Sequence, residues 1–195
     1  MVKKVAAVLA VLAAVMAAGC ASKSAYVNPD EPDVLGGTGI DSQDVRTVAQ
    51  VMSRDLLSAP AIAQATGKPV IALLPTKNET RFRVDTDIIT EQLRNDLIQF
   101  AGDKITFVER RRMGNIKEER AAKRAGEVTS SGEKMISGAN YFLTGTLKSI
   151  SKASGKMRSD YIYYSFELTD AESTEIVWAK GYDVKKVAER GVVYQ

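Results

Sequence analysis

Apolar residues recur every three or four positions in a segment that begins near residue 40, and the residues around it carry helix signals. Asp41 is a good N-cap, and Ile40 and Val45 have the spacing of a hydrophobic staple. Pro60 marks the point before which the helix should stop. The apolar stripe comprises Val45, Val48, Ala49, Met52 and Leu56. This spacing predicts an amphipathic helix that buries one face in a core.

A strand, helix, strand unit is predicted next. Residues 70–74 form a short apolar segment between two prolines, and residues 105–109 form a second apolar segment. Between them, after a polar and basic loop, Asp85 or Thr86 caps a helix that stops at Gly102. The apolar stripe of this helix comprises Ile89, Leu93, Leu97 and Phe100. The helix is long enough to serve as the crossover between two parallel strands.

The last third of the chain changes to a two-residue period. Residues 141–150, 161–169 and 175–184 alternate between apolar and polar positions, which predicts an antiparallel meander. In the middle strand the predicted core residues are Ile162, Tyr164, Phe166 and Leu168. The opposite face carries Tyr161, Tyr163, Ser165 and Glu167. Its two tyrosines are either a cross-strand pair covered by a helix, the interpretation slightly favoured, or part of a partner-binding surface.

The complete pattern predicts an α/β fold. It contains a mixed sheet, built from the strand, helix, strand unit and a C-terminal antiparallel three-strand meander, and about four flanking helices. Residues 113–125 are charged and only weakly amphipathic, and residues 130–137 are expected to form a further short helix.

The first residues of the chain have the features of a targeting signal. Lys3 and Lys4 precede an apolar stretch of 14 residues, 5–18, which is too short for an ordinary membrane-spanning helix of about 20 residues. The tetrad Ala17-Ala18-Gly19-Cys20 resembles a bacterial lipobox, although a leucine-like residue is more usual at the first position. This resemblance implies cleavage before Cys20 and acylation of its thiol. The alternative is a plain secretory signal with an incidental cysteine.

Between the signal and the first helix lies a segment rich in Ser, Asn, Pro, Asp and Gly that cannot build a core. The expected organisation is therefore a signal peptide at 1–19, a lipidated cysteine with a flexible tether at 20–39, and a single globular domain at 40–195. The glycines at 36, 37 and 39 follow no strand, so they lack the context of a phosphate-binding loop.

Composition excludes several kinds of chemistry. The chain has 195 residues, no histidine and one cysteine, so it lacks the commonest general base and metal ligand and cannot form an internal disulfide or a cysteine-based zinc cluster. Its formal net charge of +3 is too small to indicate nucleic-acid binding. We therefore expect no metal, no cofactor and no nucleic-acid partner.

Two short matches to catalytic patterns have simpler explanations. Ser131 and Lys134 have the Ser-x-x-Lys spacing of penicillin-recognising enzymes, but the other elements of such a site are missing, so Ser131 is more simply a helix N-cap. Asp85 and Asp87 have a spacing that could hold a divalent metal, but both lie where a helix begins and where carboxylates are favourable. The chain is expected not to be an enzyme, and a serine hydrolase remains the least favoured alternative.

Several segments together resemble a known family. They are Thr47-Val-Ala-Gln-Val-Met-Ser-Arg-Asp-Leu-Leu57, Asp85-Thr-Asp-Ile-Ile89, Phe107-Val-Glu-Arg110, Gly138-Ala-Asn-Tyr-Phe-Leu-Thr-Gly145, Tyr164-Ser-Phe-Glu-Leu-Thr-Asp170 and Ile176-Val-Trp178. They are similar to the LpoB-type activators of penicillin-binding proteins, and the likeness runs from the signal peptide to about Lys186.

The resemblance implies an outer-membrane lipoprotein with a small domain related to the N-terminal domain of TolB. Such a protein would face the periplasm, dock on a bifunctional class A penicillin-binding protein and raise its activity in peptidoglycan synthesis. Ala21 after the cysteine, where an aspartate would imply retention in the inner membrane, fits outer-membrane sorting. The tether is shorter than the Pro-rich linker of the enteric members. An envelope assembly or secretion accessory of the curli-export type is the alternative.

Arginines and tyrosines are the candidate contact residues, because both are enriched at interface hot spots and arginine pairs with carboxylates. The predicted partner-binding residues are Arg81, Arg83, Arg158, Tyr161 and Tyr163. Arg81 and Arg83 lie in the loop after the first predicted strand, and Lys152 and Arg158 are expected between strands of the meander. The two tyrosines lie in its middle strand. Replacing Arg81 and Arg158 with alanine is expected to weaken partner binding and to leave the melting temperature nearly unchanged.

Overall fold

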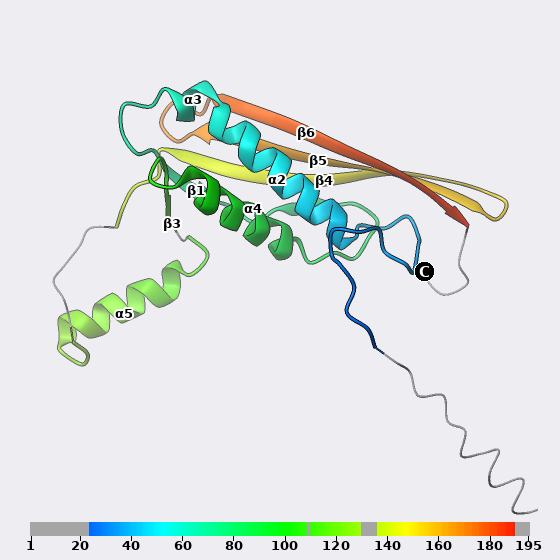
Figure 1. Ribbon diagram of the computed structural model, residues 1–195. Coiled ribbons are helices and arrows are strands. Elements are labelled where there is room, and N and C mark those ends of the chain that lie inside the picture. Colours follow the sequence, from blue (N-terminus) through cyan, green and yellow to red (C-terminus); the bar gives the residue numbers. More distant parts are fainter. Residues whose placement is uncertain (1–23, 109, 130–135, 190–195) are drawn as a thin grey trace, which may run out of the picture.

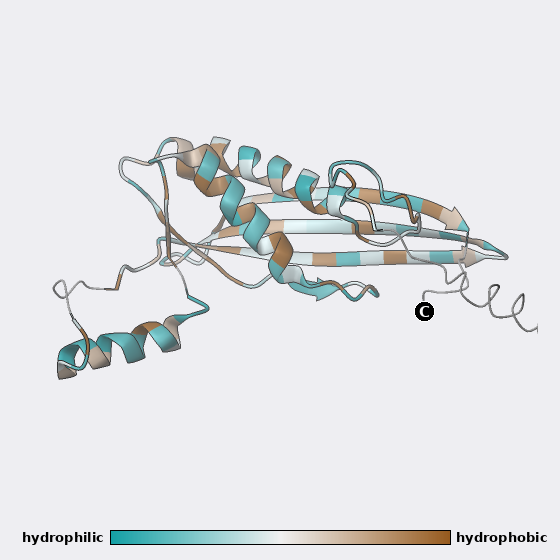
Figure 2. Cartoon of the chain, turned by 60° about the horizontal axis from the view of Figure 1, so that its bottom comes forward, coloured by the Kyte–Doolittle hydropathy of each residue, from teal (hydrophilic) through white to brown (hydrophobic). Residues whose placement is uncertain are grey.

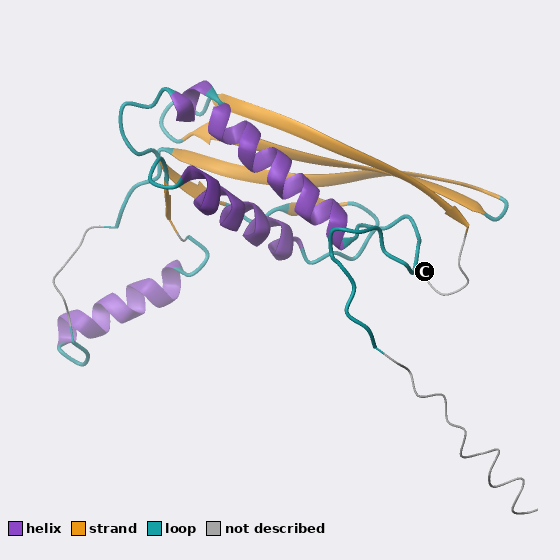
Figure 3. Cartoon of the chain, viewed as in Figure 1, coloured by secondary structure: helices purple, strands orange, loops and turns teal. Residues whose placement is uncertain are grey.

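The computed structural model describes residues 24–108, 110–129 and 136–189. A mixed sheet forms one layer, and α2 and α4 lie side by side against one of its faces (Figures 1 and 3). This is the α/β fold expected from the sequence, with a C-terminal antiparallel meander and four helices in the described part of the chain.

Both predicted helices form, and their caps are those read from the sequence. Helix α2 (Ser42–Ser58) is capped by Asp41, whose side chain accepts a hydrogen bond from the Asp44 backbone N–H. The Asp44 side chain accepts one from the Asp41 backbone N–H in turn, so the two residues form a capping box. Helix α4 (Thr86–Ala101) starts at Asp85 and ends at Gly102, where φ is 54°. A short helix not predicted from the sequence, α3 (Pro60–Ala63), begins at the proline that ends α2.

The described part of the chain forms six strands: β1 (Val70–Leu73), β2 (Lys77–Glu79), β3 (Thr106–Val108), β4 (Tyr141–Ser154), β5 (Met157–Asp170) and β6 (Ile176–Glu189). Their order is β3-β1-β4-β5-β6, and β2 pairs beside β1 along β4. Strands β1 and β3 are parallel, as expected for a strand, helix, strand unit. Strand β2 was not predicted, because its three residues are all exposed and polar and so carry no alternation.

The meander strands are each 14 residues long, which is longer than predicted. Strands β4 and β5 continue in register to Ser154 and Met157, with Gly155 at a φ of 54° in the turn. The expectation that Lys152 and Arg158 lie between strands is therefore wrong, since Lys152 belongs to β4 and Arg158 to β5. The extension was missed because its residues are mainly hydrophilic, so they do not alternate in hydropathy as the rest of the strands do (Figure 2).

The core lies between the sheet and the two helices. The four predicted residues of β5, Ile162, Tyr164, Phe166 and Leu168, are all buried there. They meet the apolar stripes of α2 and α4, so the predicted helix faces are the buried ones. Phe100 is the exception, because it is exposed at the end of α4, within 5.5 Å of the Arg54 guanidinium.

Helix α5 (Met113–Ala125) stands apart from the two-layer body and buries none of its residues (Figure 1). This agrees with its weakly amphipathic sequence. Most of the short helix expected at 130–137, including Ser131 and Lys134, lies outside the described residues.

Part of the expected tether packs on the domain. Asp30 forms an ion pair with Arg46 of α2, and the hydroxyl of Ser42 donates to the Pro29 carbonyl oxygen at 2.9 Å. Further along, Thr38 is buried. The chain therefore contacts the domain from about residue 29, well before the first helix. The domain limits drawn from the sequence remain a prediction.

Candidate partner-binding surface

The Arg81 side chain is anchored to a buried carboxylate. Its Nε donates to Asp160 Oδ1 at 3.0 Å and its Nη2 donates to Oδ2 at 2.6 Å, a two-pronged pairing that suits the planar guanidinium. Asp160 is fully buried, and the guanidinium also lies 4.1 Å from the centre of the Phe82 ring. This geometry contradicts the expectation that Arg81 can be replaced without loss of stability.

Asp160 is held ionised by its surroundings. Burial alone would raise its pKa, but hydrogen bonds from Arg81, Ser151 and Thr38 outweigh burial and lower the pKa to about 2. These partners come from the segment before α2, from the loop after β2 and from β4. A single carboxylate therefore joins three parts of the chain at the hairpin half of the sheet.

Lys186 of β6 makes a similar connection one strand away. Its Nζ donates to the Gly39 carbonyl oxygen at 2.9 Å, to Asp41 at 2.7 Å and to Asp44 at 2.6 Å. Burial would lower the pKa of Lys186, but these two carboxylates outweigh it and raise the pKa above the ordinary value of 10.5. Because Lys186 and Asp160 are paired in register, both ionic contacts belong to one polar cluster that covers the end of the core.

The other two predicted arginines have no such anchors. Arg83 is exposed in the loop before α4 and makes no ion pair or hydrogen bond with the described residues. Arg158 is half-buried near the hairpin turn, and its Nε is buried without a hydrogen-bond partner there. Both guanidinium groups are therefore better placed than that of Arg81 to pair with an incoming carboxylate.

The two predicted tyrosines lie on the opposite face of the sheet. Residues of β5 alternate, so Tyr161 and Tyr163 point away from the side that carries Asp160 and Ile162. Tyr163 is exposed and Tyr161 half-buried, and no helix of the described chain packs over them. The interpretation that a helix covers the pair is therefore wrong. The fold leaves this face open because both long helices carry their apolar stripes to the other one.

The structure thus divides the five predicted contact residues between two sides. Arg81 and Arg158 share the helix side of the sheet, on either side of Asp160, and Arg83 follows Arg81 in the loop. Tyr161 and Tyr163 lie on the side that we call the open face, defined by Ile150, Tyr161, Tyr163 and Val187 with Lys148, Lys152 and Lys185. Sequence reasoning missed Ile150 and Val187, although each is an apolar residue at a strand position that faces away from the core.

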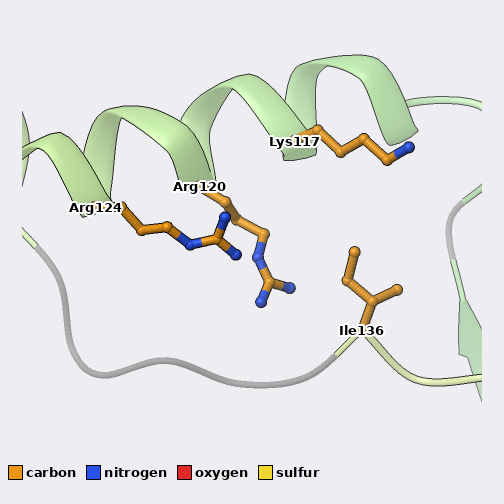
Figure 4. Close-up of a pocket in the computed structure, with 4 residues that line it drawn as sticks. All are labelled: Lys117, Arg120, Arg124 and Ile136. Carbon is orange, nitrogen blue, oxygen red and sulfur yellow. The ribbon is translucent and has the colours of Figure 1, made fainter.

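A shallow hollow beside α5 gathers positive charge. Lys117, Arg120 and Arg124 of α5 line it together with Ile136, and Figure 4 shows the two arginines extending away from the helix. Their spacing of three and four residues places them on one helix face, a signal that was available in the sequence. Arg120 and Arg124 have interaction partners of their own.

The remaining candidates have structural roles. Asp85 caps α4, and Asp87 pairs with Arg111 at 3.2 Å, so neither carboxylate of the suggested metal site is spare. Arg110 donates to the Ser137 carbonyl oxygen at 2.7 Å. Within residues 24–108, 110–129 and 136–189 no cluster of metal-ligating side chains occurs, and none of the helices there has the length and hydropathy needed to cross a membrane.

Comparison with protein families decides the classification. Residues 44–184 match the model of the family described as peptidoglycan-synthase activator LpoB. The chain belongs to the LpoB family. The match extends from the capping box of α2 through most of β6, so it includes the core, Asp160 and both predicted tyrosines. LpoB proteins are activators of a synthase rather than enzymes, which confirms the prediction of a non-catalytic protein.

Solved structures of LpoB are similar to this chain at low sequence identity. The C-terminal domain of LpoB from Salmonella enterica is 18% identical, with a TM-score of 0.46, over 72% of this chain and 98% of that one. The same domain from Escherichia coli is 19% identical, with a TM-score of 0.45, over 72% and 98%. Lipoprotein GNA1162 from Neisseria meningitidis is 9% identical, with a TM-score of 0.37, over 64% and 88%. No curated protein matches the chain.

Proposed function

We propose that this protein is a periplasm-facing lipoprotein of the outer membrane that binds a bifunctional class A penicillin-binding protein and activates its synthesis of peptidoglycan. The observation that carries the proposal is the match of residues 44–184 to the peptidoglycan-synthase activators. The match favours this function over the envelope assembly or secretion alternative, because it covers most of the folded chain.

The domain acts on its partner by binding and not by chemistry. An activator raises the activity of an enzyme when it binds the active conformation more tightly than the inactive one, so the domain needs a firm and complementary surface. The three long strands provide such a rigid surface, since β4 and β5 pair in register over their whole length and β5 and β6 pair in register from Met157 to Leu168.

The anchor is a separate part of the proposal, since Cys20 lies outside the described residues. Acyl chains on this cysteine would hold the protein at the membrane without further contacts, because each buried CH₂ contributes about 0.8 kcal/mol. Labelling cells with a radioactive fatty acid tests this directly. We expect the wild-type protein to carry the label and to sediment with outer membranes, and Cys20→Ala to do neither. Equal labelling of both would exclude Cys20 as the lipidation site.

A binding assay with purified proteins tests the partner. The chain without its signal and cysteine, residues 21–195, is titrated onto each class A penicillin-binding protein of the same cell, and binding is followed by fluorescence anisotropy. Saturable binding to one synthase supports the proposal. Absence of binding to all of them would contradict it and would favour the envelope-assembly function.

A further inference from the structure

The open face has the character of an interface. Ile150 and Val187 are 62% and 60% exposed, and Tyr163 is exposed beside them. Register places these residues in three adjacent rows across the sheet: Lys152, Ser159 and Val187, then Ile150, Tyr161 and Lys185, then Lys148, Tyr163 and Asp183. Apolar and aromatic side chains therefore form one continuous strip with charged residues at its margins. Such a strip, rimmed by polar residues, is typical of protein contact surfaces.

The strip rests on a rigid support. The Tyr163 ring lies directly over Gly181 of β6, since a Cβ at Gly181 would approach two of its ring carbons to 2.6 Å. The glycine therefore provides the space in which the ring lies against the sheet. An aromatic side chain that is already fixed loses little entropy when a partner binds.

The charge of the strip indicates the kind of partner. The nine positions of the three rows carry three lysines and a single acid, Asp183, so this part of the face is positive. Lys148 is only loosely paired, with Glu79 at 3.8 Å, and both side chains are more than half exposed. In the next row Glu189 adds one acid, near Lys156 at the hairpin end. A partner surface that presents carboxylates around an apolar centre would complement this arrangement.

We infer that the open face, and not the helix side of the sheet, is where the domain docks on an acidic surface of its synthase. The inference rests on the proposed function and narrows it to one face. It assigns Tyr161 and Tyr163 to the interface and places Arg81 and Arg158 outside it, because both lie on the helix side of the sheet and the guanidinium of Arg81 is occupied by Asp160. Ile150 and Val187 are added to the predicted contact residues. The lysines of the open face attract the acidic partner surface and so accelerate association with the synthase.

The test compares two pairs of exposed apolar residues. The double variant Ile150→Ser and Val187→Ser removes the apolar strip. Ile88→Ser and Ile98→Ser is the matched control, since these residues of α4 are 58% and 51% exposed away from the open face. Kd for the purified synthase is measured by biolayer interferometry, and the melting temperature reports folding. The first pair should raise Kd at least tenfold, and the control should leave it within twofold. Equal effects of both pairs, or none from the first, would overturn the inference.

Reversing the charge of one lysine tests whether the open face attracts an acidic partner over a distance. Lys185→Glu should slow association several-fold, most strongly at low salt, while Lys104→Glu, exposed in the loop after α4, should not. An association rate of Lys185→Glu equal to that of wild type at low salt would show that the partner surface is not acidic, which overturns the inference.

If the open face binds a second copy of this chain or a glycan instead of the synthase, two further measurements give a distinct result for each. Sedimentation velocity should show a monomer for wild type and for the Ile150→Ser and Val187→Ser variant, and a wild-type dimer dispersed by these changes would assign the face to a second copy. Retention on isolated peptidoglycan that these changes abolish, with synthase binding intact, would assign it to a glycan. Either result overturns the inference. If wild type binds no synthase, the proposed function itself fails, and the docking inference fails with it.

Discussion

At the scale of single residues, the buried carboxylate of Asp160 is the most consequential group that sequence reasoning did not find. Its partner Arg81 lies 79 positions away, so the pair exists only through the fold. The sequence did contain one signal. Asp160 is two and four residues from Ile162 and Tyr164, so it lies on the same face of the strand and thus at a core position. An acid in that phase predicts a buried ion pair, although it does not say with which residue.

Replacing Arg81 should destabilise the domain. Arg81→Ala leaves Asp160 buried without its cation, and we expect the free energy of unfolding to fall by about 2 kcal/mol, less than for a fully buried pair because Arg81 is partly exposed. Arg83→Ala, two residues away and without a partner, should change it by under about 0.5 kcal/mol. Urea denaturation of both variants measures this difference, and equal midpoints would show that the pair contributes nothing.

The contribution of Asp160 should disappear in acid. Its pKa in the folded protein is about 2, lower than the ordinary value of 3.8, so the stabilisation is complete above about pH 4 and is lost as the pH falls toward 2. We expect wild type to be more stable than Asp160→Asn at pH 7 and the difference to shrink between pH 4 and pH 2. Unfolding curves at several pH values across this window provide the check. A difference that stays constant would mean that Asp160 is not ionised in the folded protein.

Lys186 should behave in the opposite direction. Because its pKa is raised in the folded protein, its contribution is complete below about pH 10.5 and declines as the pH rises through the folded value. The stability difference between wild type and Lys186→Met should therefore be constant from pH 6 to pH 9 and smaller at pH 11. A difference that grows at pH 11 would contradict the ion pairs with Asp41 and Asp44.

At the scale of elements, the sequence predicts the helices and strands whose positions depend on local residues, and it misses those that depend on pairing with a neighbouring strand. The caps of α2 and α4 and the core phase of β5 follow from capping residues and hydrophobic spacing, and all three predictions are confirmed. Strand β2 and the outer parts of β4 and β5 are held by backbone pairing with neighbouring strands. Mainly polar segments of this kind carry no clear hydropathy pattern, so their state is decided only when the sheet assembles.

The same limit applies to the candidate site. The sequence identifies Tyr161 and Tyr163 as residues of the polar face, but whether that face is covered depends on where two distant helices pack. Helices α2 and α4 both pack on the side of the sheet that carries Ile162 and Tyr164, because the core residues of β5 lie on that side and can bury the apolar stripes of the helices. The five candidate residues were thus found by residue type, while their division between two sides of the sheet could not be predicted.

Two glycines on opposite faces of the sheet should differ in their tolerance of alanine. A Cβ at Gly145 would lie 2.6 Å from Phe166 and 2.8 Å from Thr76 Oγ1, both buried, so Gly145→Ala should cost about 1–3 kcal/mol through overpacking. Gly181→Ala displaces only the exposed ring of Tyr163 and should cost well under 1 kcal/mol. Melting temperatures compare the two variants. A larger loss at Gly181 would mean that the open face is part of the core.

At the scale of the whole molecule, contacts between the segment before α2 and the domain shorten the reach of the proposed anchor. A freely extending segment from Cys20 to the first helix could span about 65 Å, at about 3.5 Å per residue. Contacts of Pro29 and Asp30 with α2 leave about nine steps of chain, or about 30 Å, between Cys20 and the domain. A protein anchored in this way would hold its domain close to the outer membrane. The synthase would then have to extend to the domain across the rest of the periplasm.

The central claim is that the folded domain activates a peptidoglycan synthase by binding alone. The most direct test measures the glycan-polymerisation rate of each purified class A penicillin-binding protein from the same cell, with and without unlipidated residues 21–195. We predict a several-fold stimulation of one synthase that saturates with concentration and is lost in the Ile150→Ser and Val187→Ser variant. Unchanged rates for every synthase, at concentrations where the domain is folded, would contradict the account.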